Sequence, residues 1–435
     1  MNQLLRQAQQ ILSDNWRGGF TIPTNRLYPF QWNWDSGFVS IGWGHIDLQR
    51  AIQELESLFN GQWANGMIPH IIFHSETEDS YFPNFDFWDS AVNAGAPQKP
   101  KTSGITQPPV HGFVLERLLA QHPDDPRLQA FAKAIYPKIV HSHRFFYQYR
   151  DPHQEGLAFI FHPWESGRDN SALWDDILRS IVVDSEKLPS YTRKDLQHAD
   201  AAQRPTQAEY DRFVYLLDLG KRHRYDGPGI HEESPFLVQD SLINAILIRS
   251  NEALIQIGKR FKLDTAELEE WQTQSLASYR SKLWQEDLGF YASYDMRADQ
   301  AIPHREVGAL VALFAGIPER GFAERLESYL KDLHQRGYYL CPSFDVDSPR
   351  FDSKRYWRGP IWPQMNWLLY QGLKRYGFEE TAGLVRQDLI DLISQLGFYE
   401  YFEAQKSLVS KLEKGYGGGN FSWAASSYLD LILAP

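Results

Sequence analysis

The chain has 435 residues, of which 43% are hydrophobic and 14% aromatic, and its 44 basic and 55 acidic side chains give a formal charge of −11. An acidic chain without a basic run excludes an electrostatic site for nucleic acid or for an anionic membrane surface. Cys341 is the only cysteine, which excludes an intrachain disulfide and a cysteine-based zinc site and predicts a reducing, cytoplasmic compartment.

The elements predicted along the chain are mostly helices. Residues 1–6 lack the charged start and apolar stretch of a signal peptide, and we expect them to begin a short amphipathic helix. Further segments have apolar residues at steps of three and four, the period of a buried helix face. Examples are 52–59, 114–119, 130–140, 242–254, 310–314 and 368–373. Three short runs are predicted strands, at 157–161, 290–294 and 338–340.

The longest apolar run, 307–317, falls short of the roughly 20 residues that a membrane span needs, so we predict a buried helix there and no membrane partner.

On the order of a dozen helical segments, joined by long irregular connections, predict an all-α fold in one domain over residues 1–435. We expect antiparallel helix pairs that close into a ring. An open solenoid of helix pairs is the alternative, but the chain has no fixed repeat period. Polar, proline- or glycine-rich stretches at 96–109, 198–207 and 225–235 are predicted lids over one mouth of the ring.

The first cluster that suggests chemistry covers residues 28–37. It places Trp32 and Trp34 before Asp35, at the start of a helix expected from Phe38. Flat aromatic faces suit the C–H faces of sugar rings. Asp35 is explained equally well as a helix N-cap, and the two roles are compatible.

The second cluster covers residues 164–171, with Gly167 between Glu165 and Asp169 and a helix expected over 173–180. A carboxylic acid that aromatic groups shield from water stays protonated near neutral pH, as a general acid must. The alternative is a capped helix with solvated acids.

The third cluster, 354–363, gathers tryptophan, tyrosine and arginine around a Gly-Pro corner, and its Arg355 and Arg358 need anionic or hydrogen-bonding partners. The fourth is 397–403, followed by a glycine-rich stretch at 415–419 and by Phe-Ser-Trp at 421–423. Its Glu400, between aromatic neighbours, is a candidate general base, and Glu403 competes for that role.

Other chemistries fit less well. Asp345-Val346-Asp347 lacks the glycine and the terminal glutamate of an EF-hand. No HExxH pair, phosphate-binding glycine loop or G-x-S-x-G elbow is present in the sequence. Hydrolysis by two carboxylates remains, and no metal or cofactor is expected.

Taken together and in this order, the four clusters resemble the family 63 glycoside hydrolases, in particular the short bacterial branch of mannosylglycerate and glucosylglycerate hydrolases. The resemblance runs from about Tyr28 to Trp423, and the stretches 66–70, 107–109 and 422–423 also resemble family motifs. It implies an (α/α)6 barrel whose long loops, at about 60–108 and 182–212, form the lid.

The resemblance also implies site residues. Asp169 matches the general acid and Glu400 the general base of an inverting mechanism, which needs carboxyl groups roughly 6.5–9.5 Å apart. Arg204 and Tyr210 resemble a lid segment that holds the carboxylate of glycerate, which a guanidinium can grip through two hydrogen bonds. The alternative for Arg204 is a solvated loop residue. The other implied substrate-binding residues are Tyr28, Trp32, Trp34, Asp35, Tyr81, Gln107, Tyr356, Trp357 and Trp362.

The reaction that follows is hydrolysis of α-mannosylglycerate or α-glucosylglycerate to the free hexose and glycerate. Three alternatives stay open: an α-glucosidase acting on a disaccharide or oligosaccharide, a sugar epimerase or isomerase on the same kind of barrel, and a catalytically silent sugar-binding protein. A small sugar substrate is the expected partner, and the sequence leaves the oligomeric state open.

Overall fold

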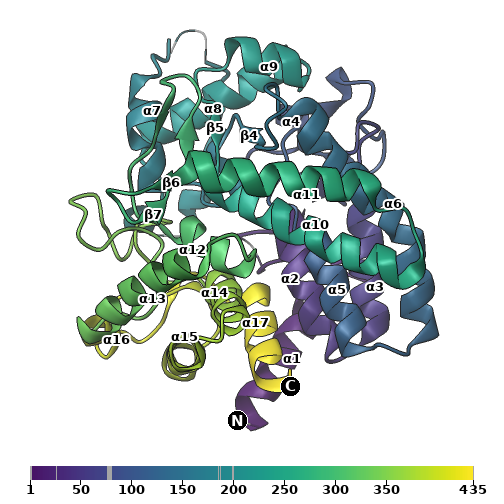
Figure 1. Ribbon diagram of the computed structural model, residues 1–435. Helices are drawn as coiled ribbons and strands as arrows, with labels where there is room; N and C mark the ends of the chain where they lie inside the picture. Colours follow the sequence, from purple (N-terminus) through teal and green to yellow (C-terminus); the bar gives the residue numbers. More distant parts are fainter. Residues whose placement is uncertain are drawn as a thin grey trace.

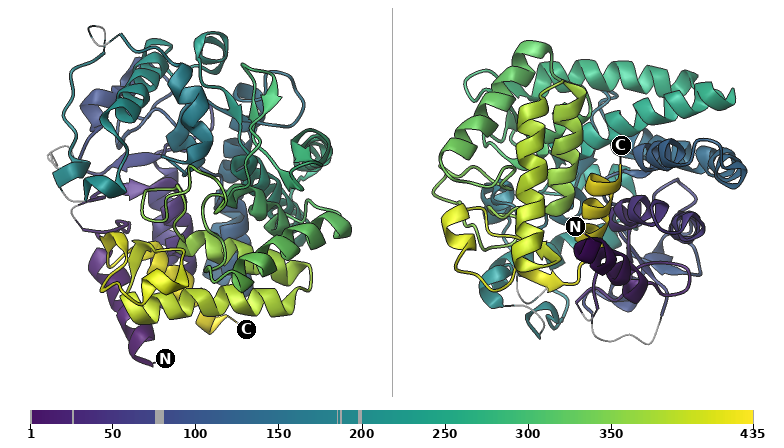
Figure 2. Two further views of the ribbon diagram at one scale, coloured as in Figure 1. Left: turned by 90° about the vertical axis from the view of Figure 1, so that its left-hand side faces the viewer. Right: turned by 90° about the horizontal axis from the view of Figure 1, so that it is seen from below.

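The computed structural model describes residues 2–25, 27–75, 81–184, 186, 188–197 and 200–434. Helices dominate this part of the chain, and they surround a common axis (Figures 1 and 2). The predicted N-terminal helix is present as α1 (Asn2–Asn15), and the apolar run 307–317 contains the buried helix α12 (Val307–Phe314).

Six helices form an inner ring, because each contacts the next and the last contacts the first. They are α2 (Asn33–Gly44), α5 (His111–Gln121), α10 (Ser241–Phe261), α12, α14 (Pro363–Arg375) and α17 (Ser422–Leu433). Every residue of α2 and of α12 is buried, as expected for helices that are enclosed on all sides.

A second set of helices packs around this ring. They are α1, α3 (Leu48–Phe59), α6 (Pro126–Tyr149), α11 (Ala266–Ser278), α13 (Arg320–Gln335) and α15 (Glu379–Leu396). Of these, α3, α6 and α13 each bury one apolar stripe and expose a polar face, the pattern that produces helical periods in a sequence.

Outer and inner helices alternate along the chain, and α17 contacts both α1 and α2, which closes the ring where the two chain ends meet (Figure 2). The prediction of a closed (α/α)6 barrel is therefore confirmed, and the open solenoid is excluded.

The remaining elements lie in the connections, and most of them cover the end of the ring that is uppermost in Figure 1. The helices of the connections are α4 (Phe85–Trp88), α7 (Asp175–Ser180), α8 (Gln207–Arg222), α9 (Gly227–Glu233) and α16 (Lys406–Val409). The predicted helix at 173–180 is confirmed in α7. A second apolar core, which includes Trp88, Phe161 and Trp174, fills this cover.

Short antiparallel strands join the connections. One sheet has the order β1 (Gln31–Trp32), β2 (Ile71–Phe73), β3 (Lys101–Thr102), with Gln31 opposite Ile72 and Ile72 opposite Thr102. A second has the order β4 (Phe159–Ile160), β5 (Val238–Gln239), β8 (Tyr294–Asp295), β9 (Gln300–Ala301). Two hairpins pair β6 (Trp284–Gln285) with β7 (Phe290–Tyr291) and β10 (Tyr399–Tyr401) with β11 (Tyr416–Gly419).

Two of the three strand predictions are confirmed, because β4 lies in 157–161 and β7 in 290–294. The third, at 338–340, is wrong: Tyr338 makes a single bridge to Gln405, and no longer ladder forms there. Much of the predicted lid lies in the cover, whereas residues 76–80, 185, 187, 198 and 199 of it lie outside the described residues.

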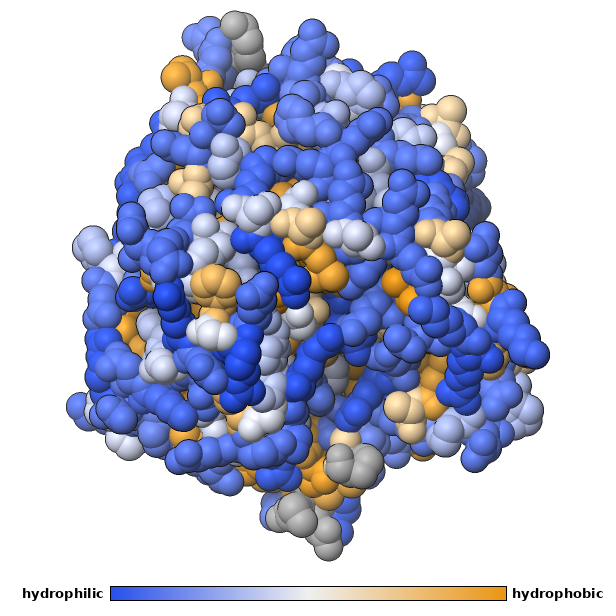
Figure 3. All heavy atoms as spheres, viewed as in Figure 1, coloured by the Kyte–Doolittle hydropathy of each residue, from blue (hydrophilic) through white to orange (hydrophobic). Residues whose placement is uncertain are grey.

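The surface in Figure 3 is mostly hydrophilic, with apolar side chains scattered over it. Within the described ranges, none of the helices has both the length and the apolar content that crossing a bilayer requires.

Candidate active site

A pocket with about 870 Å³ of empty space, including open solvent at its entrance, lies at the end of the barrel where the inner helices begin. Trp34 and Asp35 reach it from the first turn of α2, and Trp423 from the first turn of α17. We call this end the mouth. The lining residues include Tyr28, Trp32, Trp34, Asp35, His70, Tyr81, Phe82, Gln107, Trp164, Asp169, Lys194, Asp195, Arg204, Tyr210, Tyr356, Glu400, Phe421 and Trp423.

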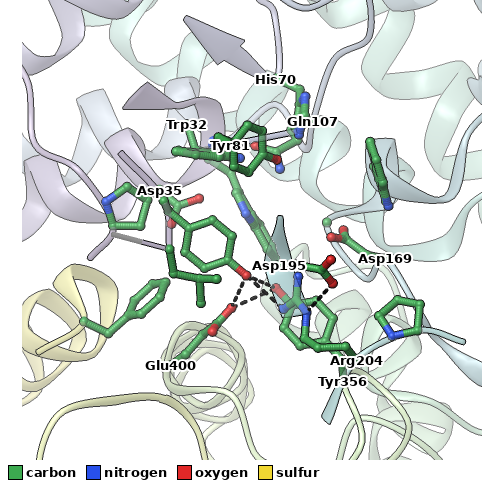
Figure 4. A pocket seen from close by; sticks show the side chains of 18 of the residues that line it. Trp32, Asp35, His70, Tyr81, Gln107, Asp169, Asp195, Arg204, Tyr356 and Glu400 are labelled. Carbon is green, nitrogen blue, oxygen red and sulfur yellow. Dashed lines mark hydrogen bonds and ion pairs between the residues drawn. The ribbon is translucent and has the colours of Figure 1, made fainter. Parts of the chain in front are cut away.

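The cavity brings together the predicted site residues from far along the chain, with the exception of Trp357 and Trp362 (Figure 4). These two indoles are buried and stacked face to face, with ring centroids 3.7 Å apart. Trp357 packs against Trp34 and Trp362 against Tyr356. The structure thus corrects their predicted role: they support the wall from behind and do not face the cavity.

Glu400 lies at the centre of β10, with its carboxyl group held by three donors. The hydroxyls of Tyr356 and Tyr28 donate to Oε1 at 2.8 and 3.0 Å, and the amide of Gly418 in β11 donates to Oε2 at 3.0 Å. Burial raises the pKa of Glu400, while the charge of Arg204 and these hydrogen bonds oppose that rise. The three donors therefore favour the ionised form that a general base needs.

Asp169 enters the cavity from the loop before the 3-10 helix Ala172–Trp174, on the side opposite Glu400 in Figure 4. Burial and the Glu400 charge raise the pKa of Asp169 to about 7, although the charge of Arg204 lowers it. A carboxyl group with this pKa carries a proton for much of the time near neutral pH, as a general acid requires.

The neighbouring Arg168 fixes the loop of Asp169. Its guanidinium is fully buried and donates to Asp240 and Glu306, the N-cap residues of α10 and α12. Gly167 has a φ of +68°, and a Cβ there would lie 2.7 Å from the indole of Trp34. The loop that carries Asp169 is therefore attached to the inner helices by an ion-pair network and by close packing.

Glu165 and Glu403, the competing acids in the sequence, have partners outside the cavity. Glu165 forms a two-pronged ion pair with Arg150, at 2.8 and 3.1 Å, and has no exposed surface. Glu403 accepts hydrogen bonds from Ser353 at 2.8 Å and Tyr416 at 3.2 Å. Neither acid lines the cavity, so the structure favours Asp169 and Glu400 over both.

Asp35 is a third buried acid in the mouth. Burial first, and then the charge of Glu400, raise its pKa well above the usual value. The helix α2 begins at Asn33, earlier than the predicted Phe38, and its N-cap is Trp32. The alternative prediction that Asp35 is the N-cap is therefore wrong, and its carboxyl group faces the cavity.

The side of the cavity formed by residues 193–210 carries most of its positive charge. Arg204 donates through Nη1 to the Tyr28 hydroxyl at 3.2 Å and through Nε to Asp195 Oδ2 at 3.1 Å. Its side chain is only 11% exposed, so the alternative of a solvated loop residue is wrong. Tyr210 lines the same side, beneath the guanidinium of Arg193 at 4.4 Å from the ring centroid.

Arg355 and Arg358 have the acidic partners that the sequence predicted they need. Arg355 pairs with Glu209 at 2.7 Å and Arg358 with Asp175 at 2.6 Å. These ion pairs attach the third cluster to α8 and α7 in the cover.

Several lining residues were missed as site residues. His70, Trp164, Phe421 and Trp423 belong to motifs that the sequence had already singled out. Lys194 and Asp195 do not, because they have no aromatic neighbours in sequence. The signal that could have revealed them is the charged triplet 193–195 inside the predicted lid.

Comparison with known proteins agrees with this geometry. The family described as "Mannosylglycerate hydrolase MGH1-like glycoside hydrolase domain" matches residues 28–424. The mannosylglycerate hydrolase of Thermus thermophilus is 41% identical over 97% of this chain and 98% of its own length. The glucosylglycerate hydrolase of Mycolicibacterium hassiacum is 34% identical over 99% of this chain and 98% of its own.

A crystal structure of a family 63 mannosylglycerate hydrolase from Thermus thermophilus, in complex with Tris and D-glycerate, superposes with a TM-score of 0.91. It is 40% identical in sequence, and the match covers 98% of this chain and 99% of that one. The resemblance seen in the motifs is thereby confirmed over nearly the whole length: the chain belongs to glycoside hydrolase family 63, in the group of the mannosylglycerate hydrolase MGH1-like domains.

Proposed function

We propose that this glycoside hydrolase is an inverting α-glycosidase that releases hexose and glycerate from α-mannosylglycerate or α-glucosylglycerate. The observation that carries the proposal is that Arg204 lines the same cavity as the two acids Asp169 and Glu400. A sugar ring between the acids and a carboxylate at the arginine would use all three groups together.

The proposed reaction is a single displacement. Asp169 gives its proton to the glycosidic oxygen as the bond from that oxygen to C1 breaks. Glu400 accepts a proton from a water molecule whose oxygen attacks C1 from the opposite face. Glycerate leaves with the proton of Asp169, and Asp169 and Glu400 return to their starting forms by exchanging protons with solvent.

Aromatic groups supply the surface for the sugar. Tyr28 and Tyr81 meet Trp32 edge to face, with ring centroids 5.2 and 5.4 Å away, and all three line the cavity. Such rings stack on the C–H faces of a hexose, while their polar edges and Asp35 can bond its hydroxyls.

Recognition of glycerate is assigned to Arg204, with Lys194 as a second cation and Tyr210 beside them. A guanidinium binds a carboxylate through parallel hydrogen bonds, which a neutral aglycone cannot reproduce. Relatives named as mannosylglycerate and glucosylglycerate hydrolases, and the related structure in complex with D-glycerate, support this choice of aglycone.

An epimerase mechanism receives little support from the cavity. Burial first, and then the charge of His162, lower the pKa of His70 to about 3. A histidine with so low a pKa is a poor base for removing a proton from a sugar carbon.

We also propose where the enzyme acts in the cell and how its chain is organised. We place it in the cytoplasm, in keeping with the single, buried and unpaired Cys341. The chain is proposed to be one catalytic domain, in which the segments at about 60–108 and 182–212 act as the lid.

The test compares hexose release from α-mannosylglycerate, from α-glucosylglycerate, from the neutral glyceramide analogue of each, and from kojibiose, nigerose and trehalose. We expect turnover of mannosylglycerate or glucosylglycerate, with weak turnover of the neutral analogue. Arg204→Met should remove most of the preference for the carboxylate, while Arg222→Met, at an exposed position of α8, serves as a matched control. Turnover of the disaccharides alone would refute the glycerate assignment, and isomerised sugar without a second product would refute hydrolysis.

A further inference from the structure

Residues 203 and 204 contact both tyrosines that donate to the Glu400 carboxyl group, and they also contact Gly417, the residue next to the third donor, Gly418. Gln203 is the last residue of the 3-10 helix Ala201–Gln203 and Arg204 is its C-cap; the N-cap, Asp200, pairs with Lys354 at 2.8 Å. This short piece of the predicted lid is therefore attached to the segment that carries Tyr356, on the far side of the cavity from α2.

The side chain of Gln203 binds β11, the strand whose Gly418 amide donates to one oxygen of the Glu400 carboxyl group. The amide of Gly417 donates to Gln203 Oε1 at 3.0 Å, and the amide of the next residue, Gly418, donates to Glu400 Oε2 at 3.0 Å. Gly417 has a φ of +67°, and a Cβ there would overlap Oε2 of Glu400. Only glycine lets the backbone come this close to Glu400, so the backbone of β11 lies directly against the Glu400 carboxyl group.

The backbone of Gln203 and the side chain of Arg204 bind Tyr356 and Tyr28, the two donors to Glu400 Oε1. The amide of Tyr356 donates to the Gln203 carbonyl at 3.2 Å, and the Arg204 guanidinium lies 4.6 Å from the Tyr356 ring centroid. Arg204 also donates to the Tyr28 hydroxyl at 3.2 Å. Both tyrosines donate in turn to Glu400 Oε1.

We propose that Gln203 is a positioning residue that couples recognition of the aglycone to the orientation of the base. This rests on the proposed role of Glu400. A carboxylate bound to Arg204 fixes the backbone at 203–204, and Gln203 then holds the amides of β11 and the backbone of Tyr356 in place around Glu400. Glycerate therefore contributes binding energy to the chemical step as well as to affinity.

The role predicts a specific pattern of kinetic change. Without the Gln203 acceptor, Gly417 and Gly418 are less firmly held, and Glu400 loses part of a hydrogen bond that lowers its pKa. The pKa of Glu400 then rises, so the acidic limb of the pH profile of kcat/KM moves to higher pH. We expect kcat to fall by about tenfold, as for loss of a hydrogen bond to a charged group, with little change in KM.

The experiment uses the full chain and three variants. Gln203→Met keeps the length of the side chain and removes the acceptor, whereas Gln203→Glu keeps an acceptor. Gln387→Met makes the same change at an exposed position of α15 and serves as the matched control. Amide hydrogen exchange of the peptide that covers 415–420 is measured for each, together with pH profiles of kcat and KM.

We expect Gln203→Met to exchange the amides of Gly417 and Gly418 roughly tenfold faster, and Gln203→Glu and Gln387→Met to exchange them at the parent rate. Unchanged exchange in Gln203→Met, or an unmoved acidic limb with KM alone affected, would overturn the coupling. A parent enzyme without activity on glycerate glycosides would refute the proposed function. The hydrogen-exchange comparison needs no substrate, so it would still decide whether Gln203 holds the amides of β11.

Discussion

The two ends of the barrel both bury carboxyl groups, but they surround them differently. At the mouth, Glu400 accepts hydrogen bonds from two tyrosine hydroxyls and one amide. At the opposite end, which we call the floor, Asp430 accepts from Arg117 at 2.8 and 3.1 Å and from His45 at 2.8 Å. The indole of Trp367 adds a further bond to Asp430, also of 2.8 Å.

This difference in partners gives the carboxyl groups opposite electrostatic properties. Burial tends to raise the pKa of Asp430, but the hydrogen bond from His45 and the charge of Arg117 hold it below the usual value. At the mouth, burial raises the pKa of Asp169, of Asp35 and of Glu400. Burial is thus common to both ends, and the nearby cations decide whether a carboxyl group is locked as an anion or can exchange a proton.

The largest effect is expected from removing the acids of the mouth. Asp169→Asn and Glu400→Gln should each lower kcat by about 10²- to 10⁴-fold, because each removes a proton transfer, and neither should lower the midpoint of thermal unfolding. Steady-state kinetics and calorimetry measure both quantities. Glu403→Gln is the matched control and should keep most of the activity; near-parent activity in Glu400→Gln would mean that the base is misassigned.

The floor should respond in the opposite way. Asp430→Asn leaves Arg117 and His45 without their buried anion, and we expect a loss of about 3–5 kcal/mol in the free energy of unfolding. The folded variant should turn over substrate at the parent rate, because the floor does not line the cavity. Urea unfolding gives the stability. A loss below about 1 kcal/mol would mean that the network is not a structural anchor.

The pH dependence of stability should distinguish the two ends. Asp169 has a pKa of about 7 against an ordinary 3.8, so its carboxyl group stabilises the fold at low pH, and that contribution is lost as the pH rises to about 7. Asp430 has a lowered pKa, so its contribution is present above 3.8 and is lost as the pH falls below that value.

We therefore expect Asp169→Asn to gain stability relative to the parent between about pH 4 and pH 7, and Asp430→Asn to come closer to the parent only below about pH 4. Unfolding free energies measured across this range provide the check. Parallel curves for the parent and Asp169→Asn would show that Asp169 is not the proton-binding group.

The smallest of these effects is expected at the tyrosines of the mouth. Tyr356→Phe and Tyr28→Phe each remove one donor to Glu400, so kcat should fall by about tenfold and the acidic limb of kcat/KM should move to higher pH. Tyr210→Phe, whose hydroxyl donates to the Phe82 carbonyl at 3.3 Å, is the control and should leave that limb in place. An equal shift in all three variants would argue against a specific role for the two donors.

The sequence predicted the barrel well, because apolar periodicity reports directly on which helix face is buried. It also identified most of the residues that line the mouth, since aromatic clusters beside Asp35, Asp169 and Glu400 stand out in the chain. The wrong strand at 338–340 shows the limit of short patterns, which do not say whether a neighbouring chain segment is available for pairing.

What the sequence did not reveal depends on contacts between distant segments. Trp357 and Trp362 have the composition of a sugar site, yet packing places them behind the wall. Gln203 lies in a polar stretch without any local signal, and Asp195 is marked only by the charged triplet 193–195; their roles come from Gly417 and Arg204. Only the folded barrel brings these pairs together.

The most direct measurement of the central claim is proton NMR of the hexose that forms first from α-mannosylglycerate or α-glucosylglycerate. Two acids on opposite sides of one cavity, with a water on the Glu400 side, predict the β-anomer as the initial product, followed by slow mutarotation. Initial release of the α-anomer would contradict the single displacement by Asp169 and Glu400.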